Sequence, residues 1–281
     1  MPTGKPRDLS LVKRVIVAVV FAPVIIWIFL SRGLPLFLFI TVLTLVGQWE
    51  LYGMIGSRLS LSHRALGYCA GLLVPADAYL NGSAFFYGIL ASVLVLSFCI
   101  EIIAGDRDRL EKVALTVLSS VYPASLLAFL LKIEQLPTLL FGAYMRYFFL
   151  FILIVIWVFD TASYFTGRAF GRHGFFPKVS PKKTVEGFIG GMIAAAAAGI
   201  ITGIVIDGML MGHYVFLSIL IALAGQTGDL SESIIKRELG VKDSSGIIPG
   251  HGGVLDRFDS LVFAGPVVFV YMLACQWMTG G

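Results

Sequence analysis

Long runs of apolar residues, separated by short polar segments, form the main pattern along this chain. The runs span residues 12–31, 34–55, 65–80, 84–104, 113–131, 147–167, 188–210, 212–235 and 258–278. A helix of about 20 mostly apolar residues is long enough to cross a bilayer. The run over 65–80 is the weakest, because Pro75 and Asp77 lie near its end. The pattern therefore predicts an all-α integral membrane protein with about nine transmembrane helices.

The composition supports this class of protein. The 281 residues are 58% hydrophobic and 14% charged, whereas an average soluble domain is about 25% charged. A soluble fold of this size cannot bury that much apolar surface. Cys69, Cys99 and Cys275 lie inside apolar runs without metal-site spacing, so we interpret them as small apolar residues.

The positions of the basic residues predict the orientation of the helices. If the N-terminus is cytoplasmic, all but three of the 21 Lys and Arg residues fall in segments on the inner side. The exceptions are Arg32, Lys132 and Arg146. Because basic residues are concentrated in the cytoplasmic loops of membrane proteins, we expect the C-terminus to lie outside.

Basic residues also precede the first apolar run. Lys5, Arg7, Lys13 and Arg14 followed by an apolar segment resemble a secretory signal peptide. The run is long and no small-residue cleavage site follows it, so we interpret it as a retained first helix. The net charge of +4 reflects topology and attraction to anionic lipid headgroups, and nothing suggests a nucleic-acid partner.

The polar chemistry of the chain is concentrated in its last part. We divide the sequence into residues 1–110 with helices one to four, 111–146 with helix five and a connector, and a catalytic region, 147–281. Two predicted cytoplasmic loops of this region, 168–187 and 236–257, are rich in Gly, Pro, basic residues and small hydroxyls. The sequence contains no recognisable internal repeat, which argues against a transporter built from inverted repeats.

A charged helix face leads into the second loop. Asp229, Glu232, Ser233, Lys236 and Arg237 have the spacing of residues on one side of an α-helix. Charges at membrane depth are usually paired, water-lined or functional. Glu232 by itself is explained by an ordinary pair with Lys236 at a helix end in water. Asp229, which follows an apolar run and a break of small residues, is a candidate functional acid.

The second loop combines glycines with charged residues. Lys242 and Asp243 precede a Pro-Gly-His-Gly-Gly segment over 249–253, which is typical of neither helix nor strand. Glycines let backbone N–H groups approach an anion closely. His251 either polarises a phosphate, caps a helix or faces water. A flexible connector is the alternative interpretation of the whole loop.

Two aspartates follow at the start of the last helix. Asp256 and Asp259, on either side of Arg257, face the same side of one turn. A favourable interaction with the helix dipole is one explanation. The other is a hard divalent cation, above all Mg²⁺, because neighbouring carboxylates repel each other unless a cation lies near them. With Asp229 and Asp243, up to four carboxylates can converge at one membrane boundary.

The first loop and the helix before it contain further candidates. Asp160 is an acid within an otherwise apolar run, and such acids are commonly functional. In the segment 180–187, Lys182 and Lys183 either hold phosphate oxygens as point charges or are a pair that snorkels to the membrane surface. The sequence has no P-loop. The glycines from 187 to 191 indicate helix packing rather than ligand binding.

Other acids near helix ends are expected to have simpler roles. Glu50 and Glu101 lie at the predicted inner ends of the second and fourth helices, where we expect them to face water. Asp77 and Asp207 lie near the predicted outer face, and we expect no catalytic role for them.

The C-terminal segments resemble the signature of the phosphatidate cytidylyltransferases, also called CDP-diglyceride synthases. That signature is S-x-x-K-R-x-x-x-x-K-D-x-x-x-x-x-P-x-H-G-G-x-x-D-R-x-D, and residues 233–259 meet every fixed position. The S-P-K-K-T-x-E-G segment over 180–187 and the segment over 157–167 are similar to this family as well. The N-terminal half matches only as a set of helices of suitable number.

The resemblance implies an enzyme of the inner membrane, commonly dimeric, that uses CTP and phosphatidic acid with Mg²⁺, and with K⁺ as a further candidate cation. It assigns metal binding to Asp229 and Asp256. Catalytic candidates are Asp229, Lys236, Arg237, Lys242, Asp243, His251, Asp256, Arg257 and Asp259. Substrate-binding candidates are Asp160, Ser180, Lys182, Lys183, Thr184, Glu186, Gly252 and Gly253. The alternatives are a CTP-dependent transferase acting on an isoprenoid-type lipid phosphate and, in a different class, a membrane transporter.

Overall fold

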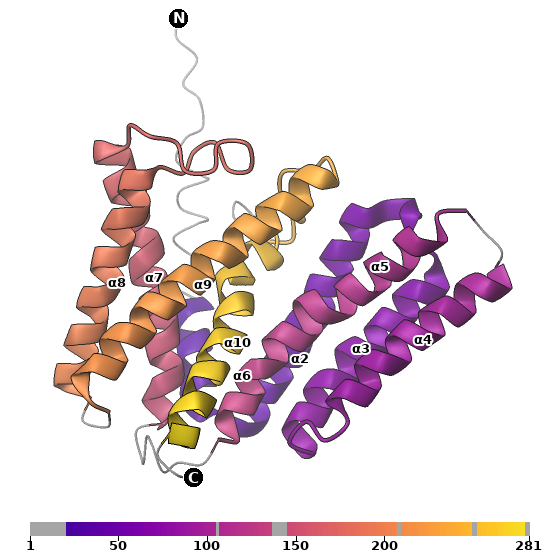
Figure 1. Ribbon diagram of the computed structural model, residues 1–281, viewed down its shortest axis with the longest axis horizontal. Coiled ribbons are helices and arrows are strands. Elements are labelled where there is room, and N and C mark those ends of the chain that lie inside the picture. The colour runs from indigo at the N-terminus through magenta and orange to yellow at the C-terminus, as the bar shows by residue number, and fades with distance from the viewer. Residues whose placement is uncertain (1–20, 105–106, 137–144, 207–208, 249–251, 279–281) are drawn as a thin grey trace, which may run out of the picture.

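The computed structural model describes residues 21–104, 107–136, 145–206, 209–248 and 252–278, and in these the regular structure is helical. A short apolar helix, Phe21–Ser31, comes first. The labelled helices of Figure 1 are α2 (Gly33–Ile55), α3 (Leu61–Leu80), α4 (Phe86–Ala104), α5 (Arg109–Ser119), α6 (Leu126–Glu134), α7 (Met145–Phe170), α8 (Val185–Val205), α9 (Met211–Glu238) and α10 (Leu255–Met278). A 3-10 turn, η1 (Gly56–Arg58), follows α2, and a π-helical stretch, η2 (Ser120–Ser125), joins α5 to α6.

Seven described helical segments are long and apolar enough to cross a membrane, which confirms an α-helical multi-pass membrane protein. They are Gly33–Arg58, Phe86–Ala104, Arg109–Glu134, Tyr147–Phe170, Val185–Val205, Met211–Glu238 and Leu255–Met278. The expected run over 65–80 forms α3, which has 20 residues but contains Pro75 and the buried Asp77. The first expected run lies partly outside the described residues.

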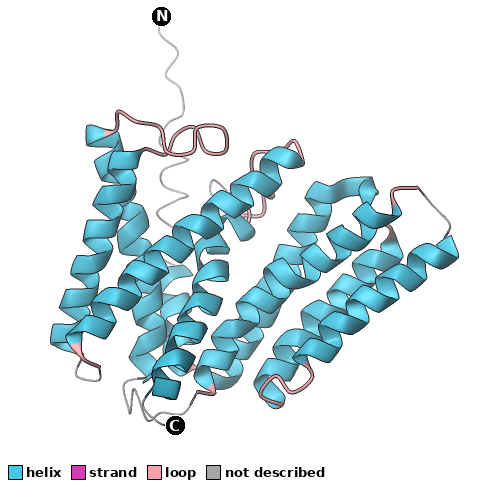
Figure 2. Cartoon of the chain, viewed as in Figure 1, coloured by secondary structure: helices cyan, strands magenta, loops and turns pink. Residues whose placement is uncertain are grey.

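The helices form two groups that share one interface. Figure 1 shows α2 to α6 on one side and α7 to α10 on the other, and Figure 2 shows that loops are confined to the two ends of the helices. Within the second group α8 packs against both α7 and α9, and α9 packs against α10. The two groups meet where α10 packs against α6 and, near its start, against α2.

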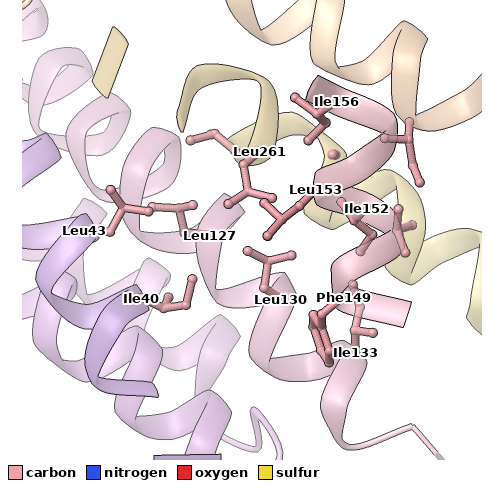
Figure 3. Close-up of a cluster of buried hydrophobic side chains, with 14 of the residues drawn as sticks. Ile40, Leu43, Leu127, Leu130, Ile133, Phe149, Ile152, Leu153, Ile156 and Leu261 are labelled. Carbon is pink, nitrogen blue, oxygen red and sulfur yellow. The ribbon is translucent and has the colours of Figure 1, made fainter. Parts of the chain in front are cut away.

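The centre of the interface is a cluster of buried aliphatic and aromatic side chains from both groups (Figure 3). Ile40 of α2 and Leu127 and Leu130 of α6 face Leu153 of α7 and Leu261 of α10 in this cluster. Because each of these side chains is almost completely buried, the N-terminal helices share a core with the helices that carry the sequence motifs.

Small residues allow the closest helix contacts. A Cβ atom on Gly187 of α8 would lie 2.7 Å from the carbonyl oxygen of Ser163 in α7. A Cβ atom on Gly228 of α9 would lie 2.3 Å from the carbonyl oxygen of Asp259 in α10. The expectation that the glycines from 187 to 191 serve helix packing is confirmed, and Gly228 brings Asp229 next to the start of α10.

The two motif-bearing loops are shorter than the sequence indicated. They comprise residues 171–184 and 239–254, because α7 continues to Phe170 and α9 to Glu238. The Thr184 side chain accepts a hydrogen bond from the Gly187 N–H at 3.1 Å and so begins α8 earlier than expected. Both loops lie at the same end of the bundle (Figure 1).

Candidate active site

An ion pair connects the two motif-bearing regions. The Lys183 Nζ atom, in the first loop, lies 2.5 Å from Oδ2 of Asp229 on α9. Both side chains are partly exposed. Asp160 of α7 interacts electrostatically with Lys183, with Asp229 and with Arg257 of α10. The structure therefore brings together acids and bases that the sequence placed in four separate segments.

Asp256 organises the second loop. Its Oδ2 atom accepts hydrogen bonds from the Ser244 N–H at 3.0 Å, the Ser244 hydroxyl at 3.0 Å and the Gly253 N–H at 2.8 Å. Its Oδ1 atom accepts a hydrogen bond from Lys236 of α9. Asp256 thus connects the interior of the loop, at Ser244, and its last part, at Gly253, to the first turn of α10 and to the last turns of α9.

Lys236 is held between two acids. Its Nζ atom also lies 3.1 Å from Oε1 of Glu232, one turn earlier on α9. The expected pairing of Glu232 with Lys236 is confirmed, but its expected setting in water is wrong, because Glu232 is fully buried. Helix packing against α10 removes this helix end from solvent.

Two further groups face the same acids. Asp259 of α10 interacts electrostatically with Asp229 and Asp160, and its Oδ1 atom accepts a hydrogen bond from the Ser260 N–H at 2.6 Å. The buried Tyr122 interacts with Glu232, Asp259, Asp229 and Asp256. Its hydroxyl has no hydrogen-bond partner within the described structure. The sequence analysis did not identify Tyr122, which the structure places in the π-helical stretch; such stretches often occur at functional sites.

Glu50 is a second residue that the sequence analysis assigned wrongly. It was expected to face water, but it is fully buried near the end of α2, beside the start of α10. The same expectation for Glu101 is also wrong, because Glu101 is buried in α4. The carboxylate of Glu50 accepts hydrogen bonds from the hydroxyls of Ser244 and Ser245 and from the N–H groups of Val254 and Leu255. No pattern in the sequence shows that α2 ends at this loop, because the contact depends on the packing of α2 beside α10.

The remaining candidates differ in their settings. Lys182, Lys242, Asp243 and Arg257 are exposed. Arg237 is also exposed and donates from Nη1 to the Val241 carbonyl at 3.1 Å.

Three of the substrate-binding candidates shape the first loop. Glu186 accepts hydrogen bonds from the N–H groups of Arg172 and His173 at 3.1 and 3.2 Å, and from the His173 ring at 2.5 Å. Thr184 caps α8, and the Ser180 carbonyl accepts the Lys183 N–H at 3.2 Å. These contacts position Lys183 for its pairing with Asp229.

The two glycines before α10 are required by close contacts. Gly252 has a φ of +82°, and Gly253 is buried against Ser244 and Glu50. A Cβ atom on Gly253 would lie 1.9 Å from Oγ of Ser244 and 2.6 Å from Oε1 of Glu50. His251 lies outside the described residues.

An apolar cavity of about 600 Å³ adjoins the charged cluster. Its walls come from the helix Phe21–Ser31, α2, α7, the second loop and α10, and include Val42, Trp157 and Phe258. Among the described residues that line it, Arg257 carries the charge. A cavity of this kind accommodates an apolar ligand that has an anionic end.

The described residues do not contain a ready-made metal cage. No three His, Cys, Asp or Glu side chains in the described ranges are grouped so that they alone could hold a metal ion. Five carboxylates and three basic side chains are nevertheless linked by ion pairs and electrostatic interactions at this end of the bundle: Asp160, Asp229, Glu232, Asp256 and Asp259, and Lys183, Lys236 and Arg257. The cluster therefore has more acidic than basic groups.

These features define a class of protein: a multi-pass membrane enzyme whose charged site, next to an apolar cavity, is suited to phosphate chemistry on a lipid. The sequence matches the cytidylyltransferase family over residues 12–275, and the chain belongs to that family. It is therefore a nucleotidyltransferase, and the resemblance found in residues 233–259 is confirmed.

Similar proteins include phosphatidate cytidylyltransferases from three staphylococci. The one from Staphylococcus saprophyticus is 33% identical over 265 residues, which cover 92% of this chain and 96% of the relative. The one from Staphylococcus epidermidis is 32% identical over 271 residues, covering 92% and 98%. The one from Staphylococcus haemolyticus is 42% identical over 128 residues, covering 45% and 49%.

Proposed function

We propose that the protein transfers CMP from CTP to phosphatidic acid, giving CDP-diacylglycerol and pyrophosphate for phospholipid biosynthesis. The observation that carries this proposal is the similarity, over nearly the whole of both chains, to proteins named phosphatidate cytidylyltransferase. The convergence of both motif-bearing regions at the Lys183–Asp229 pair supports it.

The chemistry requires charge neutralisation more than proton transfer. The phosphate of phosphatidic acid is a monoester that is largely a dianion at neutral pH, since its second pKa is about 6. One of its oxygens attacks the α-phosphorus of CTP, the bond between that phosphorus and the bridging oxygen breaks, and pyrophosphate leaves. No general base and no covalent enzyme intermediate are needed. The protein must align two anions and stabilise the charge that develops on the leaving group.

Basic residues at the bundle end supply this stabilisation. The exposed Lys182, Arg237 and Lys242 can contact the triphosphate, which arrives from water. Lys183 lies at the centre of the cluster, where its pairing with Asp229 holds it in position.

The apolar cavity is suited to the lipid. We assign it to an acyl chain of phosphatidic acid, with the lipid phosphate next to Arg257. The assignment places the lipid phosphate between the hydrocarbon interior and the acidic cluster. The nucleophile can then reach CTP while the chains stay in an apolar environment.

Mg²⁺, with K⁺ as a second candidate cation, is the proposed cofactor. The excess of carboxylates and the oxygen-only donor set fit a hard cation. Mg²⁺ usually binds one or two carboxylates, waters and substrate phosphates, so a full protein cage is not required. Asp229, which is partly exposed, and Asp256 are the proposed ligands; Asp256 accepts four hydrogen bonds, including one from Lys236. When bound, the ion would neutralise charge on the phosphates.

Location, topology and assembly follow from the same proposal. We place the protein in the plasma membrane, with the charged end in the cytoplasm because CTP is there. The distribution of Lys and Arg supports this orientation. A homodimer is proposed from the resemblance to the family.

The test is an assay of the purified protein with radiolabelled CTP and Mg²⁺ against a panel of lipid phosphates, followed by chromatography of the lipid product. Labelled CDP-diacylglycerol from phosphatidic acid is expected. Preferential labelling of an isoprenoid phosphate would overturn the proposed lipid substrate. An Asp229→Asn preparation serves as the control for activity from contaminating enzymes.

A further inference from the structure

A buried acid from the N-terminal half is connected to the second loop. Glu50, on α2, accepts hydrogen bonds at 3.1 Å from the Ser244 hydroxyl and at 2.5 Å from the Ser245 hydroxyl. It accepts two more, both at 2.7 Å, from the N–H groups of Val254 and Leu255. These partners lie 194 to 205 residues away along the chain. Ser244 and Ser245 lie within the loop, Val254 is its last residue, and Leu255 is the first residue of α10.

The number of donors explains how the acid is accommodated. An ionised carboxylate that is fully removed from water is strongly unfavourable unless charges or hydrogen bonds compensate it. Four donors converge on Glu50, and two of them are backbone N–H groups at the start of α10, which would lack partners without it. The loop and the acid therefore depend on each other.

The Ser244 hydroxyl links Glu50 to the acidic cluster. Its Oγ atom lies within hydrogen-bonding distance of Oε2 of Glu50 and of Oδ2 of Asp256. One hydroxyl proton is thus shared between two carboxylates. Asp256 in turn binds Lys236, so a continuous set of polar contacts runs from α2 to α9.

We infer that Glu50 is a positioning residue for the cytidylyl transfer: through Ser244 and the first turn of α10 it sets where Asp256 and Lys236 lie. This inference rests on the proposed function. It also makes α2, which the motifs of the family signature do not include, a part of the catalytic apparatus. The buried Gly253 supports it, because no side chain fits between Ser244 and Glu50.

The main test compares two isosteric substitutions of buried acids. Glu50→Gln replaces one carboxylate oxygen by an amide NH2 group, which cannot accept a hydrogen bond from a backbone N–H. Glu101→Gln is the matched control, because Glu101 is equally buried, pairs with His63 and Lys112, and has no described contact with the loop. We expect kcat per folded molecule to fall on the order of 10–100-fold for Glu50→Gln, as for a misplacement of about 1 Å. Glu101→Gln should lower thermal stability and leave kcat near that of the wild type.

A second readout is independent of activity. Lys242, near the start of the loop, is exposed, so trypsin cleavage after it in detergent reports opening of the loop. Faster cleavage is expected for Glu50→Gln and not for Glu101→Gln. If the wild type does not act on phosphatidic acid, the proposed function fails, whereas the cleavage rates still test the positioning of the loop.

A smaller substitution covers the case in which Glu50→Gln does not accumulate. Ser244→Ala removes the shared hydroxyl and leaves the backbone contacts of Glu50 in place, so a lower kcat with nearly unchanged stability is expected. Where both single variants accumulate, the double variant Glu50→Gln/Ser244→Ala should lose less kcat than the product of the two single losses. The reason is that both substitutions break the same connection between Glu50 and Asp256. Normal kcat in Glu50→Gln or Ser244→Ala, or equal losses in Glu50→Gln and Glu101→Gln, would overturn the inference.

Discussion

At the scale of single residues, the two proposed metal ligands have different surroundings. Asp229 forms an ion pair with Lys183 and is partly exposed. Asp256 accepts four hydrogen bonds and holds the second loop. Acids of similar proposed chemistry can therefore differ in how much they contribute to the folded structure.

Replacing these two acids by asparagine should separate the two contributions. Both variants should lose activity by orders of magnitude, because each change removes a negative charge from the proposed cation site. Asp229→Asn should change stability by less than about 1 kcal/mol, as expected for a partly exposed ion pair. Asp256→Asn should also loosen the loop, since an amide would face Lys236. Turnover measured as a function of Mg²⁺ concentration would test the loss of activity, and the melting temperature in detergent would test the change in stability.

The matched control is Asp259→Asn. It should lower activity less than the other two substitutions if Asp259 only orients its neighbours. Near-normal turnover with an unchanged Mg²⁺ dependence in Asp229→Asn and Asp256→Asn would contradict the metal assignment.

The adjacent lysines of the first loop also differ. Lys182 is exposed, whereas Lys183 pairs with Asp229. Both Lys182→Ala and Lys183→Ala should raise the KM for CTP with little effect on folding, and Lys183→Ala should have the larger effect. Steady-state kinetics with varied CTP, together with the amount of folded protein, would test this. If both variants accumulate poorly but retain normal activity per molecule, the lysines have a structural role instead.

At the scale of helices, close packing of α9 against α10 determines how the acids meet. Gly228 lies against the backbone of Asp259, and a Cβ atom on Gly225 would lie 3.2 Å from the Cβ atom of Ser260. A backbone contact cannot move aside as a flexible side chain can. The spacing between Asp229 and Asp259 therefore depends on the absence of a side chain at Gly228.

Gly228→Ala should push the two helices apart and cost about 1–3 kcal/mol, as overpacking does. Activity should fall as well, because the acids of α9 move relative to those of α10. Gly212→Ala is the matched control on the same helix, since a Cβ atom there meets nothing within 4 Å. It should be neutral or slightly stabilising. The melting temperature and the turnover of Gly228→Ala are compared with those of Gly212→Ala. Equal stability of the two variants would argue against tight packing at Gly228.

At the scale of the whole molecule, the proposed active site lies at a charged end of the bundle. The loops 171–184 and 239–254 lie at that end, and the connection between α3 and α4 lies at the other (Figure 1). Large apolar side chains such as Trp27, Ile103 and Val205 are exposed on helices, where they can contact lipid. This arrangement gives a direct test of orientation.

A reporter that works only in the cytoplasm should be active when inserted near residues 175 and 245. A reporter that works only outside should be active at the C-terminus and in the turn after α3. The expectation follows from the concentration of basic residues on the inner side. An outside reporter that is active near residue 245 would place the site on the wrong side for CTP.

The sequence by itself determined the class of the protein, the helices and the family. Apolar runs predict membrane helices because a bilayer requires a local stretch of sufficient length, which is independent of the rest of the fold. Residues 233–259 carry the family signature in consecutive positions, so it too can be recognised locally. The pairing of Glu232 with Lys236 could also be predicted from the sequence, because the two residues are one helix turn apart.

The tertiary structure decided which of these groups meet and which are buried. Glu50 contacts partners about 200 residues away, and Tyr122 reaches the acids from a different helix group, so no local pattern could indicate either role. Glu232 is buried because α10 covers the end of α9, which its own sequence does not show. Burial and contacts between distant segments depend on how helices pack, and the packing depends on side-chain shapes across the whole core.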